Sequence, residues 1–141
     1  MTAGRPISYS TRAFTFSAGH RYYVGEWAAE ENRRVFGNLT VSHGHNYSLE
    51  VTVRGTIDAR TGMVMDLGEL KRIVGELVVS RFDHADLNAD PLFAGKVPTT
   101  ENIAVTIWGL LAPRLPALTR VAVVETAKNR FEYCGEGDAP V

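Results

Sequence analysis

A pair of histidines followed by an alternating run, at residues 43–54, restricts the fold of this chain more than any other stretch. Apolar and polar residues alternate through Leu49–Val53, which is the period of a strand with one buried face. Residues two apart in a strand point to the same face, so His43 and His45 are expected to present their imidazoles side by side. This arrangement supplies half of a metal site.

A catalytic zinc site needs three protein ligands and one open position for water or substrate. The chain has 4 histidines, and His20, at the end of the preceding predicted strand, is the best candidate for the third ligand. Neutral imidazoles favour zinc over magnesium or calcium, which prefer oxygen ligands. The sequence leaves open the alternative that His43 and His45 face solvent on an edge strand.

The composition is that of an ordinary soluble globular protein. With 141 residues, 45% of them hydrophobic and 22% charged, the chain is expected to form one domain over 1–141, with a loose arm at 1–7. A formal net charge of −1 gives no electrostatic case for binding nucleic acid or an anionic membrane. No apolar run approaches the roughly 20 residues that cross a bilayer, and the first residues lack the apolar core of a signal peptide, so a cytoplasmic location is expected. The single cysteine, Cys134, excludes an intrachain disulfide and a zinc site built on several thiolates.

Hydrophobic periodicity predicts four strands and three helices. The expected strands lie at 7–20, 43–55, 119–126 and 130–133. The expected helices are a short one at 27–36 and two amphipathic ones at 66–80 and 99–112. Asp66 is expected to cap the first amphipathic helix in a capping box with Glu69, and Thr99 or Thr100 to cap the second. Strand pairs that flank grouped helices indicate an α+β fold, an antiparallel sheet with both amphipathic helices on one face.

Two further sets of side chains could carry chemistry. Asp83 precedes His84, and a neighbouring carboxylate raises the pKa of a histidine and can fix its tautomer, which suits acid–base work. The alternative is an aspartate that caps a local turn beside a surface histidine. Glu125 ends a β-branched strand, where a buried carboxylate needs a partner. That partner could be the planar edge of a ring such as a pterin, or else Lys128 or Arg130 in a salt bridge.

Seven short motifs then occur in order along the chain, at Phe16–Arg21, Glu30–Gly37, His43–Tyr47, Thr61–Leu67, Asp83–Asn88, Thr99–Asn102 and Val124–Thr126. On these motifs the chain resembles the 6-pyruvoyl tetrahydropterin synthase family, which includes the bacterial 6-carboxytetrahydropterin synthases of queuosine biosynthesis. The resemblance runs from about Phe14 to Tyr133, nearly the whole chain.

The resemblance implies the tunnelling fold, a four-stranded antiparallel sheet with two helices on one face. In that family three sheets close into a twelve-stranded barrel, and two trimers usually stack into a hexamer with active sites at subunit interfaces. Closure removes the open edges of the sheet, which is a physical reason for a small chain to form homo-oligomers.

The resemblance also implies a role for each group of candidate residues. The zinc ligands would be His20, His43 and His45. The catalytic pair would be Asp83 and His84. The pterin ring would be held by Glu125, with Thr99, Thr100 and Thr126 nearby.

In the family's reaction, zinc acts as a Lewis acid on the side chain of 7,8-dihydroneopterin triphosphate, and a base moves protons along it. In one branch of the family, the substrate loses triphosphate and undergoes an internal redox rearrangement. In the carboxy-forming branch, the substrate loses both triphosphate and acetaldehyde.

The sequence departs from the family at the residue that serves as the catalytic base. The family uses a cysteine between its Phe-Gly pair and its His-Gly-His motif, and here Leu39 stands at about that place. Leucine cannot move a proton, so the sequence favours a zinc-dependent pterin lyase with altered chemistry.

Three alternatives follow from the same departure. The standard synthase reaction could survive through Asp83 and His84. An aldolase could use a glutamate from the loop, with Glu26, Glu30 or Glu31 as candidates. A non-catalytic pterin-binding protein is the third alternative, although such a protein has no physical need for three metal ligands.

Overall fold

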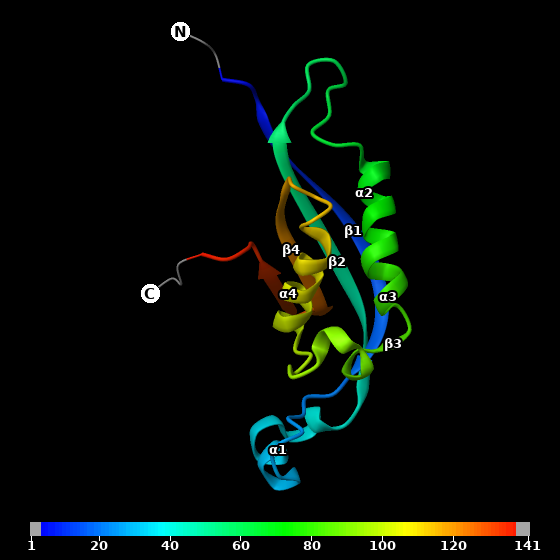
Figure 1. The fold of residues 1–141 in the computed structure, drawn as a ribbon, viewed down its shortest axis with the longest axis vertical. Helices are drawn as coiled ribbons and strands as arrows, with labels where there is room; N and C mark the ends of the chain where they lie inside the picture. Colours follow the sequence, from blue (N-terminus) through cyan, green and yellow to red (C-terminus); the bar gives the residue numbers. More distant parts are fainter. Residues whose placement is uncertain (1–3, 138–141) are drawn as a thin grey trace.

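Two long antiparallel strands, β1 (Ile7–His20) and β2 (His43–Thr56), run through most of the computed structural model (Figure 1). The structure describes residues 4–137. Each strand has 14 residues, and their pairing is unbroken from Ile7 opposite Thr56 to His20 opposite His43. Both predicted strands are confirmed, with β2 ending one residue later than expected.

The remaining strands complete a five-stranded sheet in the order β3-β1-β2-β4-β5. β4 (Leu118–Thr126) pairs antiparallel with β2, and β5 (Asn129–Tyr133) pairs antiparallel with β4. The fifth strand, β3 (Ala85–Asp86), pairs parallel with β1. The expectation of a four-stranded, wholly antiparallel sheet is therefore wrong, because a two-residue strand leaves no periodic pattern in the sequence.

Helical segments fill the connections between the strands. They are α1 (Ala29–Phe36), η1 (Gly37–Thr40), α2 (Leu67–Val74), η2 (Gly75–Val79), α3 (Ser80–Phe82), η3 (Leu87–Ala89), η4 (Pro91–Phe93) and α4 (Thr100–Leu111). The predicted helix at 66–80 is a continuous run in which the π-helical η2 joins α2 to α3. Among the described residues, no helix has both the length and the apolar character needed to span a bilayer.

Both predicted helix caps are confirmed. The Asp66 carboxylate accepts a hydrogen bond from the Gly68 N–H at 2.9 Å, and the Thr99 hydroxyl accepts one from the Asn102 N–H at 3.1 Å. Glu69 does not complete a capping box with Asp66, because its carboxylate pairs with an arginine one turn later. The caps fix where α2 and α4 begin, and hence how each helix enters the core.

The core lies between one face of the sheet and the helices. Leu49, Val51 and Val53 of β2 are fully buried, as the alternation predicts, and share one cluster with apolar side chains of α2 and α4. α2 lies against β1, and α4 lies against β4 and β5 (Figure 1). The α+β architecture is confirmed.

The N-terminal arm is shorter than expected. Residues 4–6 have no regular structure, but Ile7 already pairs with Thr56 in the sheet, and the Pro6 carbonyl accepts a hydrogen bond from Ile57. The rest of the predicted arm, residues 1–3, lies outside the described residues.

The other face of the sheet carries an ion-pair network. Glu50 of β2 accepts hydrogen bonds from Arg130 at 2.8 Å and from Arg120 at 3.1 Å, and both arginines also bond Glu132. The hydrogen bonds from Arg130 and Arg120 lower the pKa of Glu50 to about 2. The network ties β2, β4 and β5 together on the face away from the helices.

This network predicts an acid-sensitive contribution to stability. A group whose pKa is depressed on folding stabilises the protein above its unfolded pKa, so the Glu50 contribution is complete above pH 4.5 and is lost as the pH falls toward about 2. Glu50→Gln should lower the free energy of unfolding by about 1 kcal/mol at pH 7, a value kept small by solvent screening. The free energy of unfolding of this variant should also fall less steeply than that of the wild type as the pH is lowered. Urea unfolding from pH 7 to pH 2.5 measures both effects.

The matched control is Glu76→Gln, which removes an exposed carboxylate from a helical ion pair with Arg72. Exposed pairs of this kind contribute little, so this variant should unfold like the wild type. Equal losses in both variants would contradict the role assigned to Glu50.

Candidate metal centre

The pairing of β1 with β2 brings three histidines together. His20, the last residue of β1, lies opposite His43, the first residue of β2, and His45 lies two residues further along the same face. One ring nitrogen from each of the three can be chosen so that all lie within 4.8 Å of one another. The prediction that His43 and His45 present their imidazoles on one face is confirmed, and His20, the candidate third ligand, lies beside them.

Backbone carbonyls orient two of the three rings. The Nδ1 of His20 donates to the Pro98 carbonyl at 2.8 Å, and the Nδ1 of His43 donates to the Val41 carbonyl at 2.7 Å. A carbonyl oxygen can only accept, so each bond places the proton on Nδ1 and leaves a lone pair on Nε2. This is the arrangement in which metal-binding histidines are held.

The ring nitrogens that remain differ in their partners. The Nε2 of His20 lies 3.4 Å from the Tyr47 hydroxyl, a long hydrogen bond. The Nε2 atoms of His43 and His45 are buried and form no hydrogen bond with the described residues. Buried polar atoms without a partner are uncommon in native proteins and point to a missing ion or water. Three convergent imidazole nitrogens fit a first-row transition ion, with zinc the commonest, and they do not fit magnesium or calcium.

Electrostatics favour the neutral form of the ring that a metal requires. His20 is fully buried, and this burial lowers its pKa from the ordinary 6.5. Its neighbours His43 and His45 lower the pKa further, whereas the Pro98 hydrogen bond and Glu125 oppose the shift. A neutral His20 at pH 7 needs to release no proton before it binds a metal.

Glu125 lies beside the histidines. Its Oε1 is 3.2 Å from the Nε2 of His45 and 3.7 Å from the Nε2 of His20, and its side chain is only 11% exposed. The contact with His45 is close enough for an ion pair but is not aligned as a hydrogen bond. The alternative partners do not pair with it in the described structure, since Arg130 binds Glu50 and Glu132 instead. The carboxylate therefore faces the candidate centre.

The three threonines named for the pterin pocket have different environments. Thr99 uses its hydroxyl to cap α4. The Oγ1 of Thr100 is buried and has no hydrogen-bond partner among the described residues. Thr126 is exposed at the turn between β4 and β5, where its hydroxyl accepts from the Lys128 N–H. Of the three, Thr100 alone has a buried, unpartnered hydroxyl.

Asp83 and His84 are held at the edge of β1. Asp83 accepts from the Ser17 N–H at 2.9 Å, which lowers the pKa of its carboxyl, and lies 3.1 Å from the Nδ1 of His84. The His84 N–H in turn donates to the Ser17 carbonyl, and His84 adopts a left-handed backbone conformation with φ 62°. Non-glycine residues in this conformation are uncommon and cluster at functional sites.

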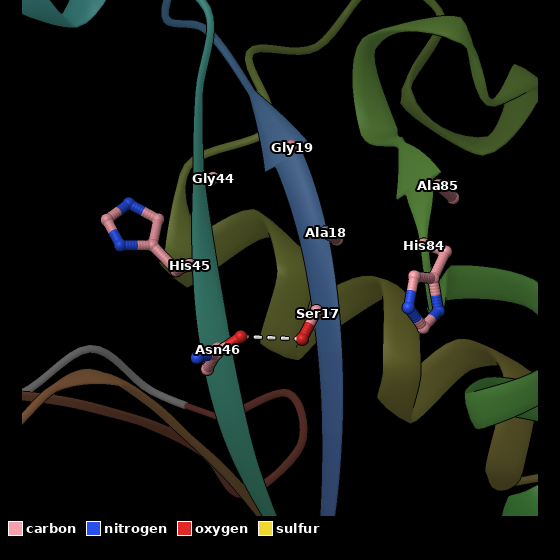
Figure 2. A pocket seen from close by; sticks show the side chains of 8 residues that line it. All are labelled: Ser17, Ala18, Gly19, Gly44, His45, Asn46, His84 and Ala85. Carbon is pink, nitrogen blue, oxygen red and sulfur yellow. Dashed lines mark hydrogen bonds between the residues drawn. The ribbon is translucent and has the colours of Figure 1, made fainter.

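His84 faces an open depression of about 410 Å³ on the sheet (Figure 2). It is lined by Ser17, Ala18, Gly19, Gly44, His45, Asn46, His84 and Ala85. The His84 side chain is 84% exposed, and Figure 2 shows the rings of His45 and His84 on opposite sides of the β1–β2 pair. No hydrogen bond or ion pair in the described part of the chain joins Asp83 or His84 to the three clustered histidines. One chain thus holds two separate groups of candidate residues.

Leu39 and the candidate glutamates lie on the segment between β1 and β2. Leu39 is 43% exposed within η1, and its carbonyl accepts from the Tyr22 N–H. Glu31 pairs with an arginine of its own helix, and Glu26 and Glu30 are exposed. Within residues 4–137 none of these glutamates contacts the histidine cluster through a hydrogen bond or ion pair.

Sequence reasoning missed the groups that orient the ligands. These are the carbonyls of Pro98 and Val41, which are backbone atoms and carry no residue signature. A possible signal for the first was the position of Pro98 immediately before the cap of α4, in a motif that already contained Thr99 and Thr100.

Known proteins share both the sequence and the fold. The family model described as 6-pyruvoyl tetrahydropterin synthase matches residues 9–136. A 6-pyruvoyl tetrahydrobiopterin synthase of Poecilia reticulata is 47% identical over 92% of each chain, and that of Homo sapiens is 47% identical over 89% of this chain and 90% of its own. The structure of Caenorhabditis elegans 6-pyruvoyl tetrahydropterin synthase superposes with a TM-score of 0.89 and 36% identity, covering 95% of this chain and 100% of its own.

The geometry predicts one metal ion per chain, bound by the three clustered histidines. Protein loaded with zinc and then desalted should contain about one zinc per chain by atomic emission, and His43→Ala should contain almost none, because two imidazoles hold zinc weakly. His84→Ala is the matched control, and it should keep its zinc because His84 lies outside the cluster. Wild-type protein that binds no zinc, or a His84→Ala variant that loses it, would contradict the assignment.

Proposed function

Because the chain belongs to the 6-pyruvoyl tetrahydropterin synthase family, we propose that it is a zinc-dependent lyase that acts on 7,8-dihydroneopterin triphosphate or a closely related pterin. The observation that carries the proposal is the cluster of His20, His43 and His45, in which backbone carbonyls orient two rings and the Nε2 atoms of His43 and His45 have no hydrogen-bond partner among the described residues. Relatives named for the 6-pyruvoyl product cover about nine-tenths of the chain, which favours that product class.

The side chains around the cluster have complementary tasks in this proposal. Bound zinc would act as a Lewis acid on the oxygens of the substrate side chain. Glu125 would accept two hydrogen bonds from the pterin ring, as a carboxylate can from a planar amidine-like edge. Since Glu125 lies 3.2 Å from His45, a ring bound there would place its side chain at the metal. Thr100, with its free buried hydroxyl, would add a contact to the ring.

Proton transfer falls to the Asp83–His84 pair. Leu39 stands at about the place where the resemblance puts the family's thiol, and a leucine side chain has no proton to transfer. The Asp83 carboxylate lies 3.1 Å from the Nδ1 of His84, which holds the proton on that nitrogen and leaves Nε2 to accept or return one. The chemistry would therefore be a lyase reaction that proceeds without a thiolate.

A second copy of the chain would complete this site. No hydrogen bond or ion pair among residues 4–137 joins His84 to the histidine cluster, and the sheet has open edges on which copies could pair. The outer side of β1 is paired only at Ala18 and Gly19, and β5 has no neighbour on its outer side among the described strands. Two open edges on one sheet suit a closed ring of copies, such as a barrel of three sheets, and a trimer or hexamer is proposed.

The shared site predicts complementation between two inactive variants. His43→Ala lacks a metal ligand and His84→Ala lacks the proton-transfer group, so each alone should lose at least about 100-fold in turnover of dihydroneopterin triphosphate. Chains of the two variants, mixed after dissociation and allowed to reassemble, should regain activity, because some interfaces receive both intact groups. Release of triphosphate and product masses provide the readout.

The control for this mixture is His43→Ala with His45→Ala, two variants that damage the same half of the site. This pair should stay inactive. Recovery in the control, or none in the test mixture of correctly assembled protein, would contradict a site shared between chains. Wild-type protein that binds pterin without converting it would contradict the proposed lyase activity and would support pterin binding alone.

Restoring a thiol at position 39 should raise the rate. Leu39→Cys places a sulfur on an exposed segment near the strand end that carries His43, and a thiol is a better proton carrier at neutral pH than leucine. The expected result is a faster turnover, with the same zinc content. Val35→Cys is the matched control, since Val35 is 51% exposed on the neighbouring helix, and it should leave the rate unchanged. An equal rate in all three proteins would mean that position 39 is not the site of the family's thiol.

A further inference from the structure

The hydrogen bond that fixes the tautomer of His20 depends on a residue far away in the sequence. His43 is oriented by Val41, only two residues away in the same segment, whereas His20 is oriented by Pro98, 78 residues along the chain. His20 is also the only fully buried member of the cluster. Whatever holds the Pro98 carbonyl in place therefore controls the deepest of the candidate ligands.

Pro98 lies at the centre of a tight turn. The Thr99 N–H donates to the Val97 carbonyl at 2.8 Å, which closes a three-residue turn around the proline. The fixed φ of proline suits that turn, and proline contributes no N–H of its own to compete for the carbonyl next to it. The turn leaves the Pro98 carbonyl free to accept from His20.

Asn102 clamps this turn to the first turn of α4. Its Nδ2 donates to the Val97 carbonyl at 2.8 Å, and its backbone N–H donates to the Thr99 hydroxyl at 3.1 Å. Asn102 thus contacts both neighbours of Pro98: its side chain bonds Val97, and its backbone N–H bonds the Thr99 side chain. An ionised aspartate has the same shape but only accepts hydrogen bonds, so it could not donate to the Val97 carbonyl.

We propose that Asn102 is a positioning residue of the metal centre, which acts through the turn at Pro98 to hold His20 with its Nε2 lone pair toward the metal. This inference rests on the proposed function insofar as the histidine cluster binds zinc. Outer groups that orient a ligand typically change metal affinity by about 10–100-fold when they are removed.

The test compares Asn102→Asp with the wild type. The substitution keeps the shape of the side chain, and an acidic residue in the first turn of a helix suits the helix dipole, so folding should be preserved. Zinc affinity, measured by competition with a chromogenic chelator, should fall by about 10–100-fold. In metal-free protein labelled with ¹⁵N-histidine, the His20 ring should change from a single Nδ1–H tautomer to a mixture. Asn102→Ala should give the same two changes.

The control is Asp66→Ala, which removes the cap of α2, a helix that forms no hydrogen bond with the Pro98 turn among the described residues. This variant should be at least as destabilised as Asn102→Asp in thermal unfolding, yet keep the wild-type zinc affinity and His20 signature. Unchanged affinity and tautomer in both Asn102 variants would overturn the inference, as would equal losses of affinity in the control.

The two proposals fail in different ways. If the wild-type protein binds no zinc, the proposed function fails, and the ¹⁵N signature of His20 in the metal-free protein still decides whether Asn102 sets its tautomer. If the wild type binds zinc and the Asn102 variants bind it equally well, the role of Asn102 alone fails.

Discussion

The register between β1 and β2 is the constraint on which the rest of the structure depends. It runs without a break from Ile7–Thr56 to His20–His43, and a slip of one residue would turn every side chain of one strand to the opposite face. The same register that buries Leu49 and Val51 under the helices therefore brings His20 to His43 at the far end. Because a change of register in the core would separate the histidines, the packing of the domain also specifies the histidine cluster.

The two faces of this strand pair have different tasks. One face packs against α2 and α4 and ends in the histidine cluster. The other carries the Glu50 network and ends in the depression beside His84. Alternation along the two strands separates the histidine cluster from the Glu50 network. His84 lies outside both strands, beside the edge of β1, and no hydrogen bond or ion pair among the described residues joins it to the cluster. This separation and the open edges of β1 and β5 are the two observations behind the proposed assembly of several copies.

The sequence predicted correctly those strands and helices in which apolar residues recur at a regular spacing. The alternation after His45 predicted β2, and caps at Asp66 and Thr99 predicted where two helices begin, because each has a local physical cause. The two-residue β3 and the π-helical turn η2 were missed because neither leaves a repeating pattern. For the candidate site, side-chain chemistry identified the three histidines, whereas the backbone carbonyls that orient two of them belong to no residue type. The position of Glu125 beside the histidines depends on how β2 pairs with β4, which composition alone does not determine.

The metal centre also affects the stability of the chain without metal. The buried Nε2 atoms of His43 and His45 have no partner among the described residues, and each buried polar atom left unsatisfied costs about 1–3 kcal/mol. Burial also lowers the pKa of His20, which favours its neutral form. An ion that binds the folded chain and not the unfolded one removes this cost and stabilises the protein by mass action. If the cluster binds a metal as proposed, metal binding and the folding of the strand ends are therefore thermodynamically coupled.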